Sequence, residues 1–167
     1  TDMKPFTEDR ETVRAWRPIL RSFTPPRPGD PQITENVLQI GGVERNFADE
    51  AERRGVDATG WSWSGKFGDL DQDGFVDLYV VNGMMEVTTF DHLTDHELVE
   101  ENQALRNDGT GSFELMPQWE LGSLASGRGM SMGDLDGDGD LDIVVNNLRA
   151  AAELFENQLC TGSSLQV

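Results

Sequence analysis

The chain has 167 residues, of which 37% are hydrophobic, so it has the length of one ordinary domain and enough apolar residues to form a core. Its 31 acidic and 13 basic residues give a formal charge of −18, which excludes nucleic acid and anionic membrane surfaces as attracted partners and favours cations. The single cysteine, Cys160, excludes an internal disulfide, and no apolar run approaches the roughly 18 residues of a membrane span, so we expect no membrane insertion.

Residues 1–35 are predicted to form an N-terminal region outside the repeated part of the chain. A weak helical pattern runs from Thr7 to Ile19, with Thr7 as the N-cap and Pro18 limiting its length. Residues 24–31 hold four of the seven prolines and are expected to form an extended linker. The chain starts without an initiator Met or a signal-peptide pattern, so we expect its natural start to lie upstream.

The rest of the chain contains an internal repeat, because residues 68–77 match residues 133–142 without gaps at an offset of 65. Short apolar runs separated by Gly, Pro, Asp and Asn are typical of an all-β protein, and about four strands fit each unit. We therefore predict a partial β-propeller of about two to three four-stranded blades. The first blade is expected at residues 36–101, the second at 102–150, and the start of a third blade or of another module at 151–167.

The first unit carries an insertion at residues 86–101 that has no counterpart in the second unit. Thr94 followed by Glu97 is a capping box, which predicts a short helix from about Asp95 to Gln103. An exposed loop and helix at a blade edge would be suited to contacting a partner.

The matched segments contain aspartates at alternate positions on a tight glycine turn. Calcium binds six to eight oxygen ligands, and closely spaced carboxylates can supply them without a long excursion of the chain. In the first loop we predict side-chain ligands from Asp69, Asp71, Asp73 and Asp77 and a carbonyl ligand from Phe75. In the second loop the same roles are predicted for Asp134, Asp136, Asp138 and Asp142, with the carbonyl from Asp140.

Other readings of these loops are weaker. An EF-hand needs an acid at position 12 and flanking helices, but position 12 is Val80 in one loop and Val145 in the other, each inside a β-branched run. Magnesium demands a small octahedron and keeps its waters, which makes calcium the better candidate. A solvated acidic turn without metal stays an alternative, because Asp and Gly favour turns on their own.

Several segments resemble a known family. Residues 67–83 and 132–147 are similar to the FG-GAP/VCBS repeats of integrin-α-type β-propellers, and residues 105–113 are similar to the hairpin of the same repeats. The tail at residues 156–167 resembles the start of the ASPIC/UnbV module that follows such repeats in cartilage-acidic-protein-like secreted proteins.

The resemblance implies a calcium-stabilised propeller in an extracellular or periplasmic setting, serving adhesion, ligand binding or scaffolding. Such propellers usually have seven blades, whereas this chain holds two and the beginning of a third. The exposed blade faces and strand edges would therefore be covered by further chain, by another subunit or by self-association.

Three further features of the sequence bear on function. His92 and His96, flanked by acids, could form a transition-metal site, although the predicted helix starts between them. Trp61 and Trp63 alternate like strand residues and could offer a carbohydrate-stacking platform, with core packing as the simpler role. No catalytic motif is present, so we predict a non-catalytic module. The alternative is a propeller fragment of a secreted carbohydrate-active enzyme whose catalytic residues lie elsewhere.

Overall fold

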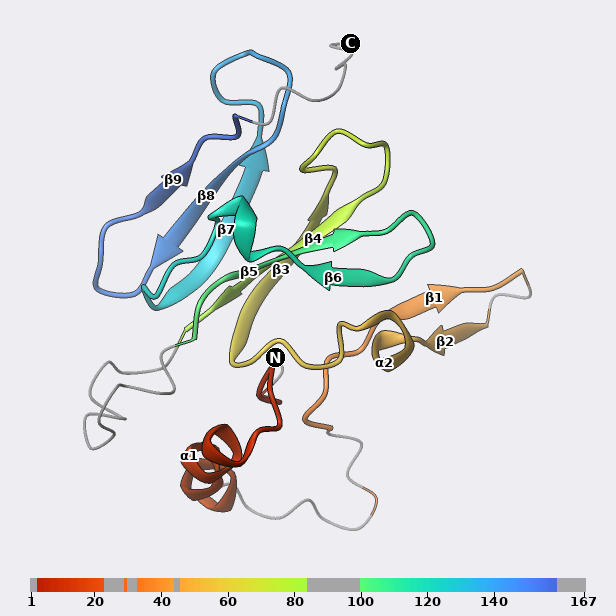
Figure 1. The fold of residues 1–167 in the computed structure, drawn as a ribbon, viewed down its shortest axis with the longest axis vertical. Coiled ribbons are helices and arrows are strands. Elements are labelled where there is room, and N and C mark those ends of the chain that lie inside the picture. Colours follow the sequence, from red (N-terminus) through yellow and green to blue (C-terminus); the bar gives the residue numbers. More distant parts are fainter. Residues whose placement is uncertain (1–2, 23–28, 30–32, 44–45, 84–99, 159–167) are drawn as a thin grey trace.

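The computed structural model describes residues 3–22, 29, 33–43, 46–83 and 100–158, and in this part the chain is mostly β-sheet (Figure 1). Three antiparallel sheets are formed, in the strand orders β1-β2, β3-β4-β5-β6 and β7-β8-β9. The strands are β1 (Gln39–Gly41), β2 (Phe47–Asp49), β3 (Ser62–Gly68), β4 (Asp77–Asn82), β5 (Gln103–Asn107), β6 (Phe113–Leu115), β7 (Gly127–Gly133), β8 (Asp142–Asn147) and β9 (Glu153–Phe155). The helices are α1 (Arg10–Ser22), α2 (Ala51–Arg54) and the 3₁₀ turn η1 (Pro117–Trp119). The all-β prediction is thus confirmed in its general form, because the described part of the chain is mostly β-sheet with few helices.

The sequence repeat is also a structural repeat. β3 pairs with β4 from Ser62↔Asn82 to Gly68↔Asp77, and β7 pairs with β8 from Gly127↔Asn147 to Gly133↔Asp142, each position 65 residues after its counterpart. Both pairs carry a register irregularity at the same place, after the first residue of β3 and of β7. The same side-chain and turn chemistry therefore builds the same hairpin twice.

The sheets do not follow the phase of the predicted units. The second predicted blade, residues 102–150, includes β5 and β6. In the structure these two strands instead complete the sheet of β3 and β4, with Leu78 opposite Leu105. β9 adds to β8 in the same way, with Ile143 opposite Phe155. The β1–β2 hairpin, the sequence counterpart of β5–β6, pairs with no other strand of the described residues and extends away from the other sheets (Figure 1).

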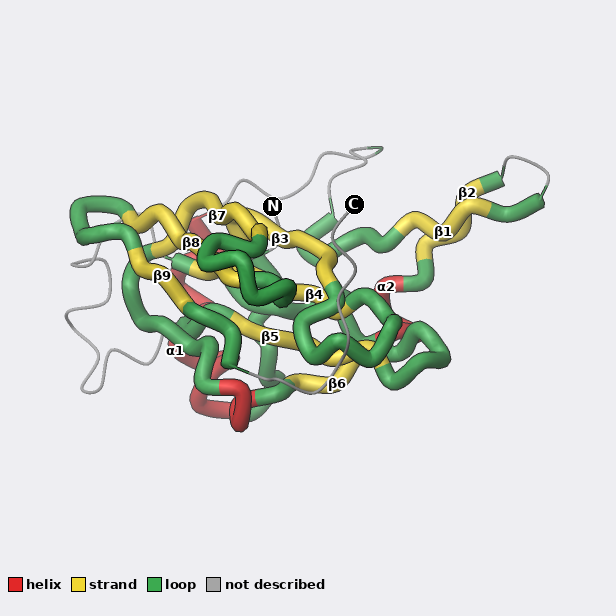
Figure 2. The backbone as a smooth tube through the Cα atoms, turned by 90° about the horizontal axis from the view of Figure 1, so that it is seen from above, coloured by secondary structure: helices red, strands yellow, loops and turns green. Residues whose placement is uncertain are grey.

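The main core lies between the two larger sheets, which pack face to face (Figure 2). The buried side chains of this core come from both sheets and from the loop between β3 and β4. They are Leu70, Tyr79, Val81, Ala104, Ile143 and Val145. The sheets approach closely at Gly68, where a Cβ atom would lie 2.9 Å from Leu141 Cδ1. This packing places the ends of the two hairpins beside each other.

The outer faces of the two sheets differ in how far they are covered. On the first sheet, Leu78, Val80 and Leu105 are covered by Ala51 and Val56 around α2. On the second sheet, the positions equivalent to Leu70 and Ala104 are Leu135 and Leu154, whose exposed fractions are 59% and 62%.

The N-terminal helix differs from its prediction at both ends. α1 starts at Arg10, because Asp9 is the residue whose carboxylate accepts the backbone N–H groups of Glu11 and Thr12, each at 2.9 Å. Hydrogen bonds from the side chains of Thr12 and Thr7 lower the pKa of Asp9 below its ordinary value, so Thr7 supports the cap without being the cap.

Pro18 does not end the helix, which continues to Ser22. A proline removes one amide donor and usually breaks a helix, but tertiary packing can hold the helix in place. Trp16 is buried and its ring lies 6.1 Å from that of Trp61, which anchors α1 to the body of the protein.

The helix predicted to end at Gln103 is wrong at that end, because residues 100–102 are not helical and Gln103 begins β5. A strand partner across the sheet outweighs the local capping signal there. The capping box itself lies outside the described residues, as do His92, His96 and Cys160. No helix in the described ranges is long and apolar enough to cross a membrane.

Candidate metal centre

Each Asp-rich segment forms a loop between two paired strands, and both loops lie at the same end of the sheets (Figure 1, top). We call residues 69–77, which follow β3, the first Asp loop, and residues 134–142, which follow β7, the second Asp loop. Each loop makes two turns with positive φ, at Gln72 (56°) and Gly74 (91°) in the first and at Gly137 (85°) and Gly139 (97°) in the second. The glycine at the second turn is the residue that tolerates this backbone at little cost.

Carboxylates inside each loop accept backbone N–H groups from the same loop. The Asp69 carboxylate accepts the Gly74 N–H at 2.9 Å, and the Asp134 carboxylate accepts the Gly139 N–H at 3.2 Å. These bonds bend the backbone around the first aspartate of each loop and direct further acidic side chains toward it.

The last aspartate of each loop is buried and ties the loop to the sheet. The two oxygens of Asp77 accept the N–H groups of Leu70 and Asn107, both at 2.9 Å. Asp142 makes the equivalent bonds to Leu135 at 2.8 Å and Asn157 at 3.0 Å. Burial raises the pKa of Asp77 above its ordinary value, although its two backbone donors act in the opposite direction.

The structure brings most of the predicted ligands together. In the first loop, oxygens of Asp69, Asp71 and Asp77 lie within 4.8 Å of one another, and in the second loop the same holds for Asp134, Asp136 and Asp138. Oxygens bound to one calcium ion at about 2.3–2.6 Å can be no farther apart than roughly 5 Å, so both clusters fit the ion. Asp73 and Asp142 stand outside these clusters.

Two of the predicted ligands have surroundings that the sequence did not indicate. The Phe75 ring packs over the hairpin glycine Gly109. Asp140 was predicted to offer only its carbonyl, but the residue is 5% exposed and its side-chain Oδ1 atom has no hydrogen-bond partner among the described residues. Burial, followed by the charges of Asp138 and Asp142, raises the pKa of Asp140 to about 6. A buried carboxylate oxygen without a donor beside an acidic cluster is suited to a cation.

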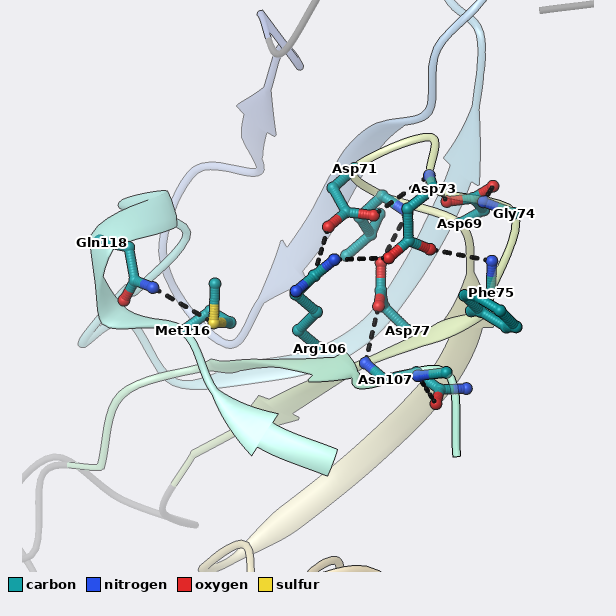
Figure 3. A network of polar contacts seen from close by, with 12 residues as sticks. Asp69, Asp71, Asp73, Gly74, Phe75, Asp77, Arg106, Asn107, Met116 and Gln118 are labelled. Atoms are coloured by element: carbon teal, nitrogen blue, oxygen red, sulfur yellow. Dashed lines mark hydrogen bonds and ion pairs between the residues drawn. The ribbon is translucent and has the colours of Figure 1, made fainter. Parts of the chain in front are cut away.

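A basic residue outside the predicted set contacts the first loop. Arg106, on β5, donates from Nε to Asp71 at 2.5 Å and from an Nη atom to Asp73 at 2.6 Å (Figure 3). These two bonds raise the pKa of Arg106 above its ordinary value. The guanidinium thus holds one aspartate of the cluster, Asp71, and one outside it, Asp73.

The two loops also contact each other. Gln72 of the first loop donates its side-chain N–H to the Gly139 carbonyl of the second loop at 3.1 Å. Asn157, next to β9, donates to the Leu70 carbonyl at 2.8 Å. The loops therefore form one continuous surface and are not separate features of two distant units.

The tryptophans proposed as a carbohydrate platform are both engaged within the protein. Trp61 packs on Trp16, while Trp63 donates its indole N–H to the Gly83 carbonyl at 2.5 Å. The Arg128 guanidinium lies 4.2 Å from the centre of the Trp63 ring.

A family model described as FG-GAP-like repeat matches residues 83–145, a span that contains β5 to β7 and the second Asp loop. This match supports the FG-GAP resemblance, and with it a β-propeller-type module, for that part of the chain. It covers neither the first Asp loop nor the tail that resembles an ASPIC/UnbV module, most of which lies outside the described residues. No curated protein matches the chain.

Proposed function

We propose that this chain is a calcium-binding, non-catalytic β-propeller module that acts in protein or ligand binding, adhesion or scaffolding in an extracellular or periplasmic setting. The observation that carries the proposal is the repetition of one loop, with the same pairing register, the same buried closing aspartate and a cluster of carboxylates in each copy. An acidic turn that served only solubility would have no need of this repeated geometry.

The donor chemistry favours calcium over softer metals. In the described part of the chain, every member of the two clusters is a carboxylate, and hard cations with flexible coordination prefer such oxygens. The unpartnered Asp140 Oδ1 adds a buried acceptor to the second loop. When bound, calcium would neutralise these carboxylates, while Asp69 and Asp134 would continue to shape the backbone around the ion.

The open face of the second sheet supports the propeller part of the proposal. Leu70 is 2% exposed because the second sheet covers it, whereas Leu135, in the equivalent position, is 59% exposed. A further blade, in this protein beyond residue 167 or in another chain, would cover Leu135 as the second sheet covers Leu70. The tail would then lead into that blade or into the ASPIC/UnbV module that it resembles.

Calorimetric titration with calcium tests the proposal. We expect two sites in the parent protein and one in Asp136→Ala, and a higher melting temperature in calcium than in chelator. Ligand binding to the native state alone contributes about 2.7 kcal/mol per site at a hundredfold excess over Kd.

Glu114→Ala is the matched control, because it removes an exposed carboxylate of equal charge outside both loops. It should leave the number of sites unchanged. A parent protein whose melting temperature is the same in millimolar calcium and in chelator would refute the proposal.

A further inference from the structure

We propose that Arg106 is an internal counter-charge of the first Asp loop and competes with the metal there, so that the second Asp loop fills first. The inference rests on the proposed calcium function. It adds an order of binding to the two loops and assigns a regulatory role to a residue on a neighbouring strand.

The contacts of Arg106 reach two of the predicted ligands at once. Its guanidinium bonds Asp71 at 2.5 Å and Asp73 at 2.6 Å, and these carboxylate side chains are only 15% and 24% exposed (Figure 3). A planar guanidinium holding two carboxylates is a strong, geometrically specific interaction. Asp71 belongs to the cluster that would hold the ion, so calcium and Arg106 draw on the same carboxylate.

The second loop has the opposite charge at the equivalent position. Strand pairing places Leu105 opposite Leu78 and Phe155 opposite Ile143, so the residues that follow, Arg106 and Glu156, are structural counterparts. The next residues along the chain, Asn107 and Asn157, support the correspondence, because the backbone N–H of each donates to the closing aspartate of its loop.

The surroundings of the two loops therefore differ strongly in charge. Four carboxylates and one guanidinium give the first loop a formal charge of −3, whereas five carboxylates and Glu156 give the second a formal charge of −6. Without metal, Arg106 relieves the mutual repulsion of the first loop, and the second loop has no such cation at the equivalent position. With metal, the second loop offers the stronger field and no guanidinium at that position to displace.

Site-resolved NMR separates the loops. The Gly74 and Gly139 amides donate to the first aspartate of their own loops and so report each loop individually. During a calcium titration of the parent protein we expect the Gly139 signal to shift at lower calcium than the Gly74 signal. Arg106→Gln should lower the calcium midpoint of Gly74 by about tenfold and leave that of Gly139 unchanged.

Three further variants complete the test. Glu156→Arg should raise the calcium midpoint of the Gly139 signal. Arg106→Lys keeps the positive charge, so it should keep the calcium midpoint of the Gly74 signal close to that of the parent. Arg53→Gln is the matched control: its side chain is 63% exposed and pairs with Glu50, and it removes the same charge elsewhere. In this variant the calcium midpoints of the Gly74 and Gly139 signals should both equal those of the parent.

A parent in which both loops fill at the same calcium concentration, or an Arg106→Gln protein with an unchanged Gly74 midpoint, would overturn the inference. Failure of the proposed function has a different signature, because then neither glycine would respond to calcium in any variant and the competition would fall with it. In chelator, Arg106→Gln should reduce the hydrogen-exchange protection of the Gly74 amide but not of Gly139. Unchanged protection would contradict the counter-charge role independently of any metal.

Discussion

The two equivalent leucines at the start of the Asp loops allow a direct test of how the sheets pack. Leu70 and Leu135 occupy the same position in the repeat, and each N–H donates to the closing aspartate of its own loop. Leu70→Ala removes a side chain from the centre of the main core, whereas Leu135→Ala removes one from an open face. The first change should be strongly destabilising and the second nearly neutral.

The size of the effect follows from burial. Leu70 is 2% exposed and packs among fully buried side chains of both sheets, so its truncation should cost about 3 kcal/mol, including the cavity left behind. For a chain of this length, that loss lowers the melting temperature by roughly 6–12 °C. Leu135 is 59% exposed, and its truncation should change stability by no more than about 0.5 kcal/mol.

Urea unfolding followed by tryptophan fluorescence, in calcium and again in chelator, measures both variants against the parent. Equal losses in the two variants would refute the proposed packing, because they would mean that Leu135 is as well covered as Leu70. A dependence of the Leu135→Ala effect on protein concentration would identify self-association as the source of that cover.

Other sites give further predictions. A Cβ atom added at Gly127 would overlap the neighbouring strand, whereas a Cβ atom added at Gly129 would have no neighbouring atom within 4 Å. Gly127→Ala should therefore lower the free energy of unfolding by about 1–3 kcal/mol in thermal unfolding, and Gly129→Ala by far less. Tyr79→Phe removes the hydroxyl that donates to the Leu121 carbonyl at 2.7 Å, and the same assay should show a loss of about 1 kcal/mol. Because the folded state lowers the pKa of Asp9, the stability that this cap contributes is present above its unfolded value of about 3.8 and is lost as pH falls below it. Circular dichroism of the parent should thus show a loss of helix on acidification that is smaller in Asp9→Asn, and equal losses in the two proteins would contradict the cap assignment.

Much of the candidate site could be predicted because its chemistry is local. Glycine turns, alternating aspartates and the β-branched run that follows lie within about twenty consecutive residues, so the loop and its strand are readable without knowledge of the fold. Arg106 was missed for the opposite reason. It lies 35 residues from Asp71 in the chain, and only the pairing of β5 with β4 brings the two together.

The errors in the fold also come from long-range interactions. A repeat in the sequence identifies equivalent strands but not the sheet to which each strand belongs, so the phase of the units could not be deduced. At α1, local rules predicted that Thr7 is the N-cap and that Pro18 limits the helix. The helix instead starts after Asp9 and passes through Pro18, with Trp16 buried against Trp61.

The hydrogen bond from Gln72 to the Gly139 carbonyl has a thermodynamic consequence for the end of the molecule that carries both Asp loops. A side chain of one loop holds the backbone of the other, so a change in the backbone of either loop acts on this hydrogen bond. Linkage then requires that whatever an ion in the first loop does to the affinity of the second, an ion in the second does to the first by the same factor. We expect that factor to be close to one, because the bond joins two neutral groups and each midpoint is set mainly by the charges of its own loop.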